Sequence, residues 1–452
     1  MKFRTLALRC VLAAIALSFA ALLVQARFPQ PAAEYQARRA KLRSEVDGPV
    51  VLFGYTSRND AGEVAVFFQD EDFYYLTGYS EPDAALILIP DAPAGKSSTG
   101  PSEILYLPPR DPRESIWGGA HLGPHDPGVA EKTGFQAVRP FADLRGDLAN
   151  LAKTNPKFYT LLPKGPENGY PQLATWSAWV KDALPPQSEI QDVQPILTQM
   201  RMVKSPGEIA LLQKAVDASV DAQFAAMKMM RPGLMEYQVA AKMEEVHKFE
   251  GCAREAYAPI VGAGFFSTVL HYDALNNEIK DGDVVVLDVA GEYGGYDADI
   301  TRTLPANGKF TARQREIYDI VLGAQNAAIA AAKPGVFMYG APGNLQQIAY
   351  DYINSHGKDK DGKPLGPYFV HGLGHGLGLN VHDPTEFHQP LKAGMAVTIE
   401  PGIYLRDENI GVRIEDDILL TPDGHVVMTE KLPRNADEIE KVMAEARAHS
   451  QQ

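Results

Sequence analysis

Cysteine is nearly absent from this chain, which has only Cys10 and Cys252 among its 452 residues. Cys10 lies in an N-terminal segment that we expect to be removed, so the mature chain would carry one thiol. A single thiol excludes an intrachain disulfide, and the fold must therefore be stabilised by its hydrophobic core. The mature chain is long enough for two ordinary domains.

Long apolar runs are equally scarce, and the one that is present lies at the start. Residues 10–23 form an apolar run that is too short to span a membrane, which takes about 20 residues. A basic segment precedes it, and Val24-Gln25-Ala26 follows with small residues where signal peptidase reads. We predict a signal peptide over residues 1–26, cleaved after Ala26, with export to the periplasm or medium and membrane contact only during export. An uncleaved anchor is the alternative.

Basic residues are fewer than acidic ones. The chain has 43 Lys and Arg but 57 Asp and Glu, so its formal net charge is −14. Removal of residues 1–26 takes away Lys2, Arg4 and Arg9 but no acid, which moves the charge to −17. Such an acidic surface repels phosphate backbones and argues against nucleic acid as a partner.

The first half of the mature chain, residues 27–184, mixes helix and short strands. Residues 35–46 are predicted as a helix. Runs rich in aliphatic and aromatic side chains predict strands at 50–56, 64–69, 85–90, 103–108 and 157–163. The polar stretch 185–200 predicts a linker or domain edge before a second domain over residues 201–440.

Two segments of the second domain repeat one pattern, in which a capping box opens a helix and a basic-Pro-Gly stop ends it. The capping boxes begin at Ser205 and Thr311, and the stops are RPG (231–233) and KPG (333–335). The repetition predicts an internally duplicated α+β domain, with a chance recurrence of ordinary caps as the alternative.

Two acids flank a turn in the segment VVVLDVAGEYGGYDADITRT (284–303). Asp288 ends an apolar strand, Asp299 opens the next one, and a hairpin between them would bring both carboxylates together. Either acid alone would more simply be a solvated strand end or a cap. Two carboxylates held close together repel each other unless a cation lies between them.

Histidines and glycines gather in HGLGHGLGLNVHD (371–383). His375 lies among four glycines, which let the backbone approach a ligand closely. His371 and His382 are spaced for the same site, and His271 is a candidate to join them. A nucleotide-binding interpretation of the glycines is weak, because the phosphate-loop ending is missing.

Two glutamates follow on later strands. Glu400 stands before Pro401-Gly402, and strand alternation places Arg413 and Glu415 on one face. A surface Arg–Glu pair is the simple alternative, but the surrounding run is mostly apolar and a buried carboxylate needs a partner.

These segments together supply one nitrogen and four carboxylate ligands: Asp288, Asp299, His375, Glu400 and Glu415. This set suits two divalent cations, Mn²⁺ first, with Zn²⁺ or Co²⁺ as alternatives. Two such ions roughly 3.5–4 Å apart hold a bridging hydroxide and polarise a carbonyl, which is hydrolytic chemistry.

On these motifs, residues 200–437 resemble the pita-bread metallopeptidases, in the branch of Xaa-Pro aminopeptidase (aminopeptidase P) and Xaa-Pro dipeptidase (prolidase). The resemblance implies an α+β pita-bread catalytic domain preceded by a smaller α/β domain. It also implies that the four acids and the histidine named above hold two metals, with Asp299 and Glu415 bridging them and Glu400 also shuttling protons. His271, His371, His382 and Arg413 match the family's substrate-side residues.

Residues 35–145 resemble the family's N-terminal domain, most clearly over 67–88 and at Trp117. The chain departs from some relatives at Gly376, where they carry a bulky aromatic residue, and after Trp117, where they carry basic residues. The resemblance implies a homo-oligomer, a dimer or tetramer, that cleaves the N-terminal residue from peptides with proline second, by attack of a metal-bridging hydroxide. The alternatives are an Xaa-Pro dipeptidase and a non-catalytic peptide-binding protein on the same fold.

The signal peptide yields the first testable prediction. The mature protein should begin at Arg27, which intact-mass measurement and N-terminal sequencing of exported protein would show. Met1 retained on membrane-bound protein would establish the anchor instead, and unprocessed protein in the soluble cytosol would exclude a signal altogether.

Overall fold

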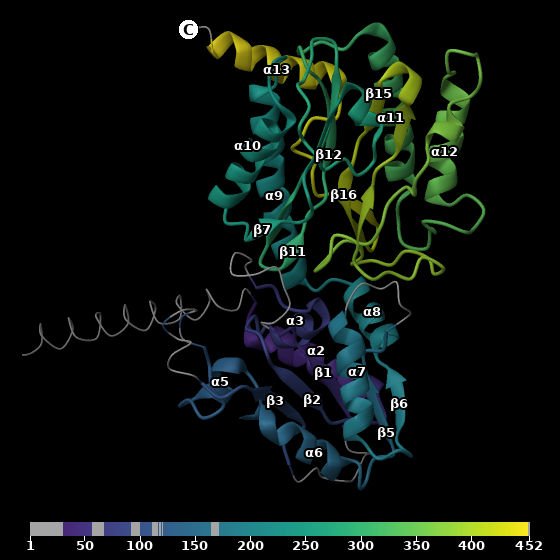
Figure 1. Cartoon of the computed structure of the whole chain (residues 1–452). Coiled ribbons are helices and arrows are strands. Elements are labelled where there is room, and N and C mark those ends of the chain that lie inside the picture. Colours follow the sequence, from purple (N-terminus) through teal and green to yellow (C-terminus); the bar gives the residue numbers. More distant parts are fainter. Residues whose placement is uncertain are drawn as a thin grey trace, which may run out of the picture. The chain divides into compact units, whose positions relative to one another are not determined.

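The computed structural model describes residues 30–56, 67–91, 100–110, 116, 119, 121–163 and 171–450 (Figure 1). The predicted signal peptide and Trp117 lie outside these residues. The chain forms two compact units that meet in sequence between Met200 and Arg201. Each unit has its own core, as expected for a chain of this length.

The first unit is built on a six-stranded mixed sheet in the order β4-β3-β2-β1-β5-β6. The strands are β1 (Val50–Phe53), β2 (Ala85–Leu88), β3 (Glu103–Leu107), β4 (Ala137–Pro140), β5 (Lys157–Thr160) and β6 (Glu189–Asp192). The helices are α2 (Ala32–Glu45), α3 (Glu71–Thr77), α5 (Val129–Thr133), α6 (Leu144–Leu151) and α7 (Pro171–Ala183). Alternate residues such as Val51 and Ile87 pack on Leu148 of α6 and Val180 of α7, which gives this face of the sheet its core.

The predicted helix and four of the five predicted strands are present in this unit. Residues 67–70, part of the strand predicted over 64–69, are irregular, and residues 64–66 lie outside the described residues. Here the Gln69 side chain accepts from Tyr55 N and donates to the Glu81 carbonyl, and Asp70 caps α3. These side-chain bonds replace strand pairing.

The stretch 185–200, which we predicted to be a linker or domain edge, ends where the two units meet in sequence and holds edge strand β6 and most of α8 (Gln194–Met202). Polar residues and prolines made it look like a connection. An edge strand needs little apolar surface, and β6 pairs in parallel with β5 through its backbone.

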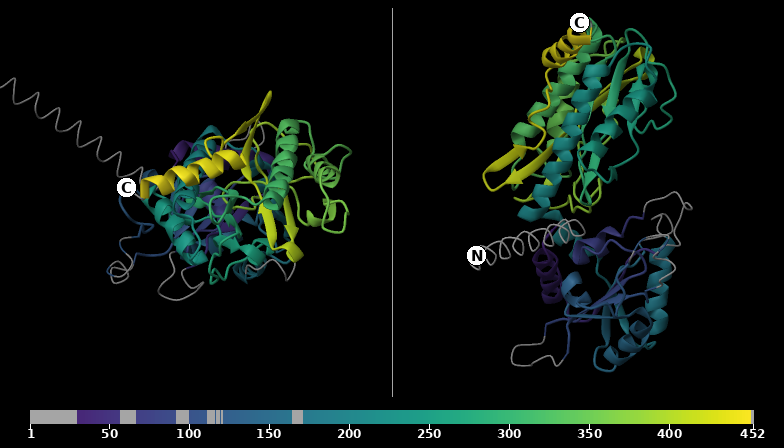
Figure 2. Two further views of the ribbon diagram at one scale, coloured as in Figure 1. Left: turned by 90° about the horizontal axis from the view of Figure 1, so that it is seen from above. Right: turned by 90° about the vertical axis from the view of Figure 1, so that its left-hand side faces the viewer.

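The second unit packs helices against several small antiparallel sheets (Figures 1 and 2). Its helices are α9 (Pro206–Met229), α10 (Glu236–Phe249), α11 (Ala312–Ala331), α12 (Leu345–His356) and α13 (Ala436–Ser450). The three-stranded sheets are β11-β10-β7, β12-β9-β8 and β13-β16-β17, and β14 pairs with β15. Their strands are β7 (Arg254–Glu255), β8 (Ile260–Ala263), β9 (Val284–Asp288), β10 (Gly291–Tyr293), β11 (Tyr296–Asp297), β12 (Thr301–Pro305), β13 (Ala396–Ile399), β14 (Gly402–Leu405), β15 (Ile410–Arg413), β16 (Asp416–Thr421) and β17 (Gly424–Val427).

Both predicted capping boxes are present and open the long helices α9 and α11. α9 packs on α10 and α11 packs on α12. In the first half β9 pairs with β12, and in the second half β13 pairs with β16. Each half is thus a helix pair plus a pair of antiparallel strands, which agrees with the predicted duplication.

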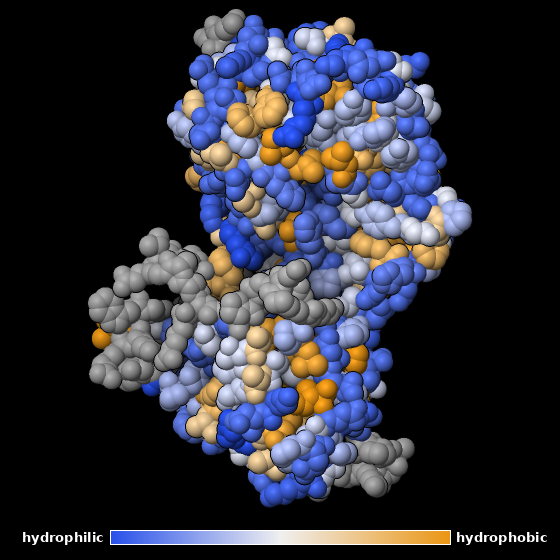
Figure 3. All heavy atoms as spheres, turned by 45° about the vertical axis from the view of Figure 1, so that its right-hand side comes forward, coloured by the Kyte–Doolittle hydropathy of each residue, from blue (hydrophilic) through white to orange (hydrophobic). Residues whose placement is uncertain are grey.

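Hydrophilic side chains dominate the face of both units that Figure 3 shows, and apolar side chains form only small patches on it. In the parts of the chain that the structure describes, no helix combines the length and apolar character that crossing a bilayer requires.

Candidate metal centre

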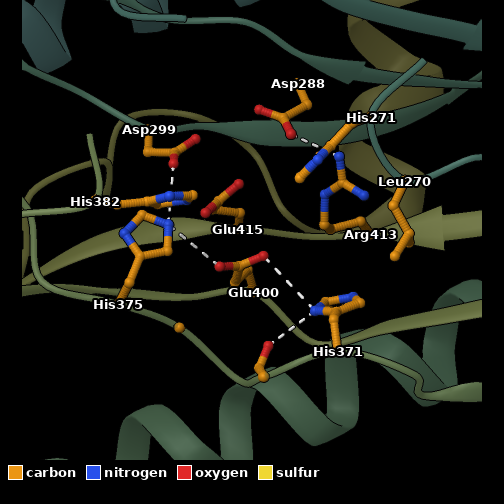
Figure 4. A pocket seen from close by; sticks show the side chains of 12 residues that line it. Leu270, His271, Asp288, Asp299, His371, His375, His382, Glu400, Arg413 and Glu415 are labelled. Atoms are coloured by element: carbon orange, nitrogen blue, oxygen red, sulfur yellow. Dashed lines mark hydrogen bonds and ion pairs between the residues drawn. The ribbon is translucent and has the colours of Figure 1, made fainter. Parts of the chain in front are cut away.

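One pocket in the second unit is lined by all nine residues that the sequence singled out (Figure 4). They are His271, Asp288, Asp299, His371, His375, His382, Glu400, Arg413 and Glu415. The structure therefore brings together segments that lie up to 144 positions apart in the chain, although the role of each residue stays a prediction.

The four acids lie at equivalent places in the two halves. Asp288 is the last residue of β9, and Asp299 comes just before β12. Glu400 comes just after β13, and Glu415 just before β16. Antiparallel pairing joins the strands of each half, so each pair of acids meets at the same end of its strand pair.

Asp299, His375 and Glu415 form a group in which one ligand atom from each residue lies within 4.8 Å of the other two. His375 Nε2 is 3.3 Å from an Asp299 oxygen and 3.4 Å from a Glu400 oxygen. The Thr398 hydroxyl supports this corner, because it accepts from His375 N and donates to Glu400.

Asp288 lies in the same pocket but is held by other groups. Its two carboxylate oxygens accept hydrogen bonds of 2.6 Å from Tyr257 and Arg413. A carboxylate oxygen has more than one lone pair, so these bonds orient Asp288 and leave it able to bind a cation.

Burial and the close approach of charged groups shift the pKa values in this pocket. Burial raises the pKa of Glu400 to about 8, with Asp299 adding to the rise and His375 opposing it. Burial and the carboxylates of Asp299 and Glu400 hold the pKa of Glu415 well above its ordinary value. Burial opposes protonation of His375, but the hydrogen bond to Asp299 and the charges of Asp299 and Glu400 together outweigh burial and raise the pKa of that imidazole to about 9.

These observations fit a divalent cation. The Glu415 Oε1 atom is buried and has no hydrogen-bond partner among the described residues. Its other oxygen accepts from Thr301 at 2.6 Å, so one oxygen is held while the other stays open to a ligand. A cation would neutralise the carboxylates that burial otherwise drives toward protonation.

The three other histidines differ in their surroundings. His271 and His382 are exposed at the pocket, and the His382 ring meets the His375 ring edge to face at 4.3 Å. His371 is bonded on both sides, by Nδ1 to the Gly372 carbonyl and by Nε2 to the Tyr404 hydroxyl, each at 2.8 Å. Burial and the charge of Arg413 lower the pKa of His371 to about 4 and keep the ring neutral.

Several residues around the pocket escaped the sequence reasoning. Arg413 donates to Tyr404, Thr301 and Asp288, so Tyr404 connects it to His371. Tyr404 had a local signal, since it lies four residues after Glu400 in the motif TIEPGIY. Tyr257 and Thr301 had no short-range signal, because their partners lie on distant segments.

A buried ionic cluster holds the loop that carries His382. The carboxylate of Asp383 accepts from Arg201 at 2.6 Å and from Lys204 at 2.9 Å, and all three side chains are buried. Asp383 N also donates to the Gly376 carbonyl. A Cβ at Gly376 would lie 1.8 Å from the Thr385 hydroxyl, so this packing accounts for the absence of a bulky residue there.

Comparison with known proteins places these motifs in context. The sequence profile of metallopeptidase family M24 matches residues 210–422, and that of the aminopeptidase P N-terminal domain matches residues 35–159. An Xaa-Pro aminopeptidase of Haemophilus influenzae is 34% identical over 443 residues, which cover 91% of this chain and 97% of that protein. An Xaa-Pro dipeptidase of Pyrococcus furiosus is 38% identical over 246 residues, 54% of this chain and 67% of that protein.

Solved structures agree over nearly the whole chain. A variant of Escherichia coli aminopeptidase P in complex with substrate superimposes with a TM-score of 0.81 at 30% identity, covering 93% of this chain and 99% of that one. A putative aminopeptidase P from Bacillus anthracis gives a TM-score of 0.83 at 29% identity, covering 92% and 99%.

The raised pKa values predict how metal binding depends on pH. A cation binds the deprotonated forms of Glu400 and His375, whose pKa values without metal are about 8 and about 9. Mn²⁺ should therefore displace protons and bind more tightly as pH rises from about 6 to 8. Titration calorimetry in buffers of different ionisation enthalpy counts the protons released, and an affinity that stays constant over this range would contradict the prediction.

Proposed function

This chain belongs to metallopeptidase family M24, and from that premise we propose that it is an Xaa-Pro aminopeptidase, which hydrolyses the bond between an N-terminal residue and a following proline. The observation that carries the proposal is the single pocket that collects four carboxylates, four histidines and Arg413. Relatives named Xaa-Pro aminopeptidase match both units of the chain, which supports this substrate class.

The residues that would hold the metals are Asp288, Asp299, His375, Glu400 and Glu415. We propose Mn²⁺ as the native ion, because carboxylate oxygens predominate in this set, with Zn²⁺ or Co²⁺ as alternatives. When bound, two such cations would supply Lewis acidity toward the scissile carbonyl and make water a nucleophile at neutral pH.

Glu400 is proposed to move the proton. Hydrolysis adds water to the carbonyl carbon, breaks the C–N bond and places a proton on the proline nitrogen. A carboxylate that faces the reacting atoms can accept the proton from water and deliver it to that nitrogen. Glu400 lies between His375 and His371 in the pocket, within reach of both.

The exposed histidines are proposed to bind substrate. His271 and His382 present ring nitrogens at the pocket, where they can donate to a carbonyl oxygen as negative charge develops on it. Arg413 and His371 share Tyr404 as a partner, so they fix one wall of the pocket. Peptides that begin with Xaa-Pro present a tertiary amide without an N–H at the bond to be cleaved, which is why a dedicated enzyme is needed.

Two further features belong to the proposal. The N-terminal apolar run supports export to the periplasm or the medium. The match of the first unit to the aminopeptidase P N-terminal domain supports a homo-oligomer, a dimer or a tetramer.

An Xaa-Pro dipeptidase is the second candidate, favoured by the 38% identity to the Pyrococcus furiosus enzyme. That match covers only 54% of this chain, against 91% for the Haemophilus influenzae aminopeptidase. Turnover of Xaa-Pro-Yaa tripeptides would support the aminopeptidase, and turnover of Xaa-Pro dipeptides alone would establish the dipeptidase.

Metal dependence tests the proposal directly. Chelation should abolish hydrolysis of Xaa-Pro-Yaa peptides and Mn²⁺ should restore it, since every proposed step needs the polarised carbonyl. Glu415→Ala should bind fewer metal ions than the parent protein by elemental analysis, because its open oxygen is lost. Full activity in rigorously metal-free protein would refute the mechanism.

His271 offers a second test, since it is expected to act on substrate and not to hold metal. His271→Ala should keep the metal content of the parent protein while kcat falls by about 10²–10³, the usual cost of losing a stabilising donor. A matching loss of bound metal would assign His271 to the metal centre and remove it from this role.

A further inference from the structure

Two glutamines occupy equivalent places in the two halves of the second unit. Gln223 lies on α9 and Gln325 on α11, and the side chain of each is completely buried. Each stands eight residues before the basic residue of its helix stop, Arg231 in RPG and Lys333 in KPG. The duplicated pattern therefore places one buried amide at the same position in each long helix.

Gln223 joins the two strands that carry the first pair of acids. Its Nε2 donates to the Leu287 carbonyl at 3.2 Å and to the Ile300 carbonyl at 3.1 Å. Leu287 immediately precedes Asp288, and Ile300 immediately follows Asp299. One amide group thus bonds the backbone beside both carboxylates.

Gln325 does the same for the second pair. Its Nε2 donates to the Ile399 and Ile414 carbonyls, both at 3.1 Å, and to an Asp416 oxygen at 2.9 Å. Ile399 immediately precedes Glu400, and Ile414 immediately precedes Glu415. All four acids of the candidate metal centre therefore have a neighbour that is bonded to one of these two glutamines.

The unpaired side-chain oxygens of Gln223 and Gln325 indicate that each residue acts through its N–H groups. Both Oε1 atoms are buried without a hydrogen-bond partner among the described residues. Because only the amide nitrogen can donate to a carbonyl, the pair of carbonyl partners settles which end of each amide faces the strands. A buried acceptor without a partner lowers the stability of a fold, and each of the two glutamines has one. Their N–H groups nevertheless bond the strand ends in both halves.

We propose that Gln223 and Gln325 are positioning residues that set the separation of the two carboxylates in each pair and thereby the affinity for divalent metal. This inference rests on the proposed function for the existence of the metals. The carboxylates of each pair repel one another once they are deprotonated, as metal binding requires, so a restraint on the backbone at the strand ends would keep their separation fixed. Groups that orient metal ligands in this way commonly change metal affinity by about 10–100-fold when they are replaced.

The simpler interpretation is that each glutamine only satisfies two carbonyls in the core. That role would contribute to stability but would not affect metal binding more than other buried hydrogen bonds do. A test must therefore compare metal affinity with the stability of the metal-free protein.

Gln223→Met and Gln325→Met are the informative variants, because methionine has a similar volume and no N–H. Each has a matched control on the same helix. Ser219→Ala on α9 removes a buried hydroxyl that accepts from Gly291 N at 3.0 Å. Tyr318→Phe on α11 removes a buried hydroxyl that donates to the Arg434 carbonyl at 2.7 Å.

The full-length mature protein is stripped with chelator, and each variant is characterised by its melting temperature without metal and by calorimetric titration with Mn²⁺. All four variants should melt below the parent protein. Only the two methionine variants should bind Mn²⁺ more weakly, by at least about 10-fold. Should a methionine variant fail to fold, Gln→Asn at the same position keeps the amide but is too short to reach both carbonyls, and the same loss of affinity is expected.

The outcomes separate this inference from the proposed function. If the parent protein binds Mn²⁺ and the methionine or asparagine variants bind it equally well, the positioning role is wrong. If the control variants lose as much affinity as the methionine variants, the glutamines act only through stability and the inference is also wrong. If the parent protein itself binds no divalent metal, the metal centre of the proposed function is wrong and the inference falls with it.

Discussion

Mutual repulsion among buried carboxylates is the constraint on which the rest of the second unit depends. Four acids line one pocket, and burial raises the pKa of Glu400 and Glu415 because their charged forms are poorly solvated there. Arg413 supplies a fixed positive charge beside them, through its bond to Asp288. Two hydrogen bonds join the two halves beside these acids. Glu415 N donates to the Thr301 carbonyl, and Asp299 N donates to the Asp417 carboxylate. The fold thus concentrates negative charge that a cation would balance.

The duplication explains how a single chain can build such a centre. Each half contributes a capped helix, an antiparallel strand pair and two acids at one end of that pair. Because the two ends face the same pocket, the acids converge without a long loop having to hold any of them. Strand ends positioned by a sheet and a packed helix are more rigid than loops, which suits ligands that must keep a fixed separation.

Local sequence patterns were sufficient for the parts of the site that depend on short-range chemistry. Asp288 and Asp299 were recognisable from a strand–turn–strand segment, and His375 from its glycines. The fold class followed from the same motifs through their resemblance to a known family. The partners of these residues were not recognisable. Gln325 meets Ile399 and Ile414 from 74 and 89 positions away, and no pattern within a helix shows which buried polar side chain will face a distant strand end. Edge strand β6 was missed for a related reason, because its backbone pairing leaves little mark on side-chain composition.

The ionic cluster at Asp383 decides where a shortened form of this protein could begin. The two cations that neutralise this aspartate, Arg201 and Lys204, precede the first long helix of the second unit. A fragment starting at Ser205 would retain every acid and histidine of the pocket and the complete capping box of α9. It would nevertheless leave a buried carboxylate without its counter-charges beside His382, a situation that typically costs about 3–5 kcal/mol. The few residues before the helix cap are therefore part of the peptidase unit, and an expression boundary chosen by helix limits alone would remove them.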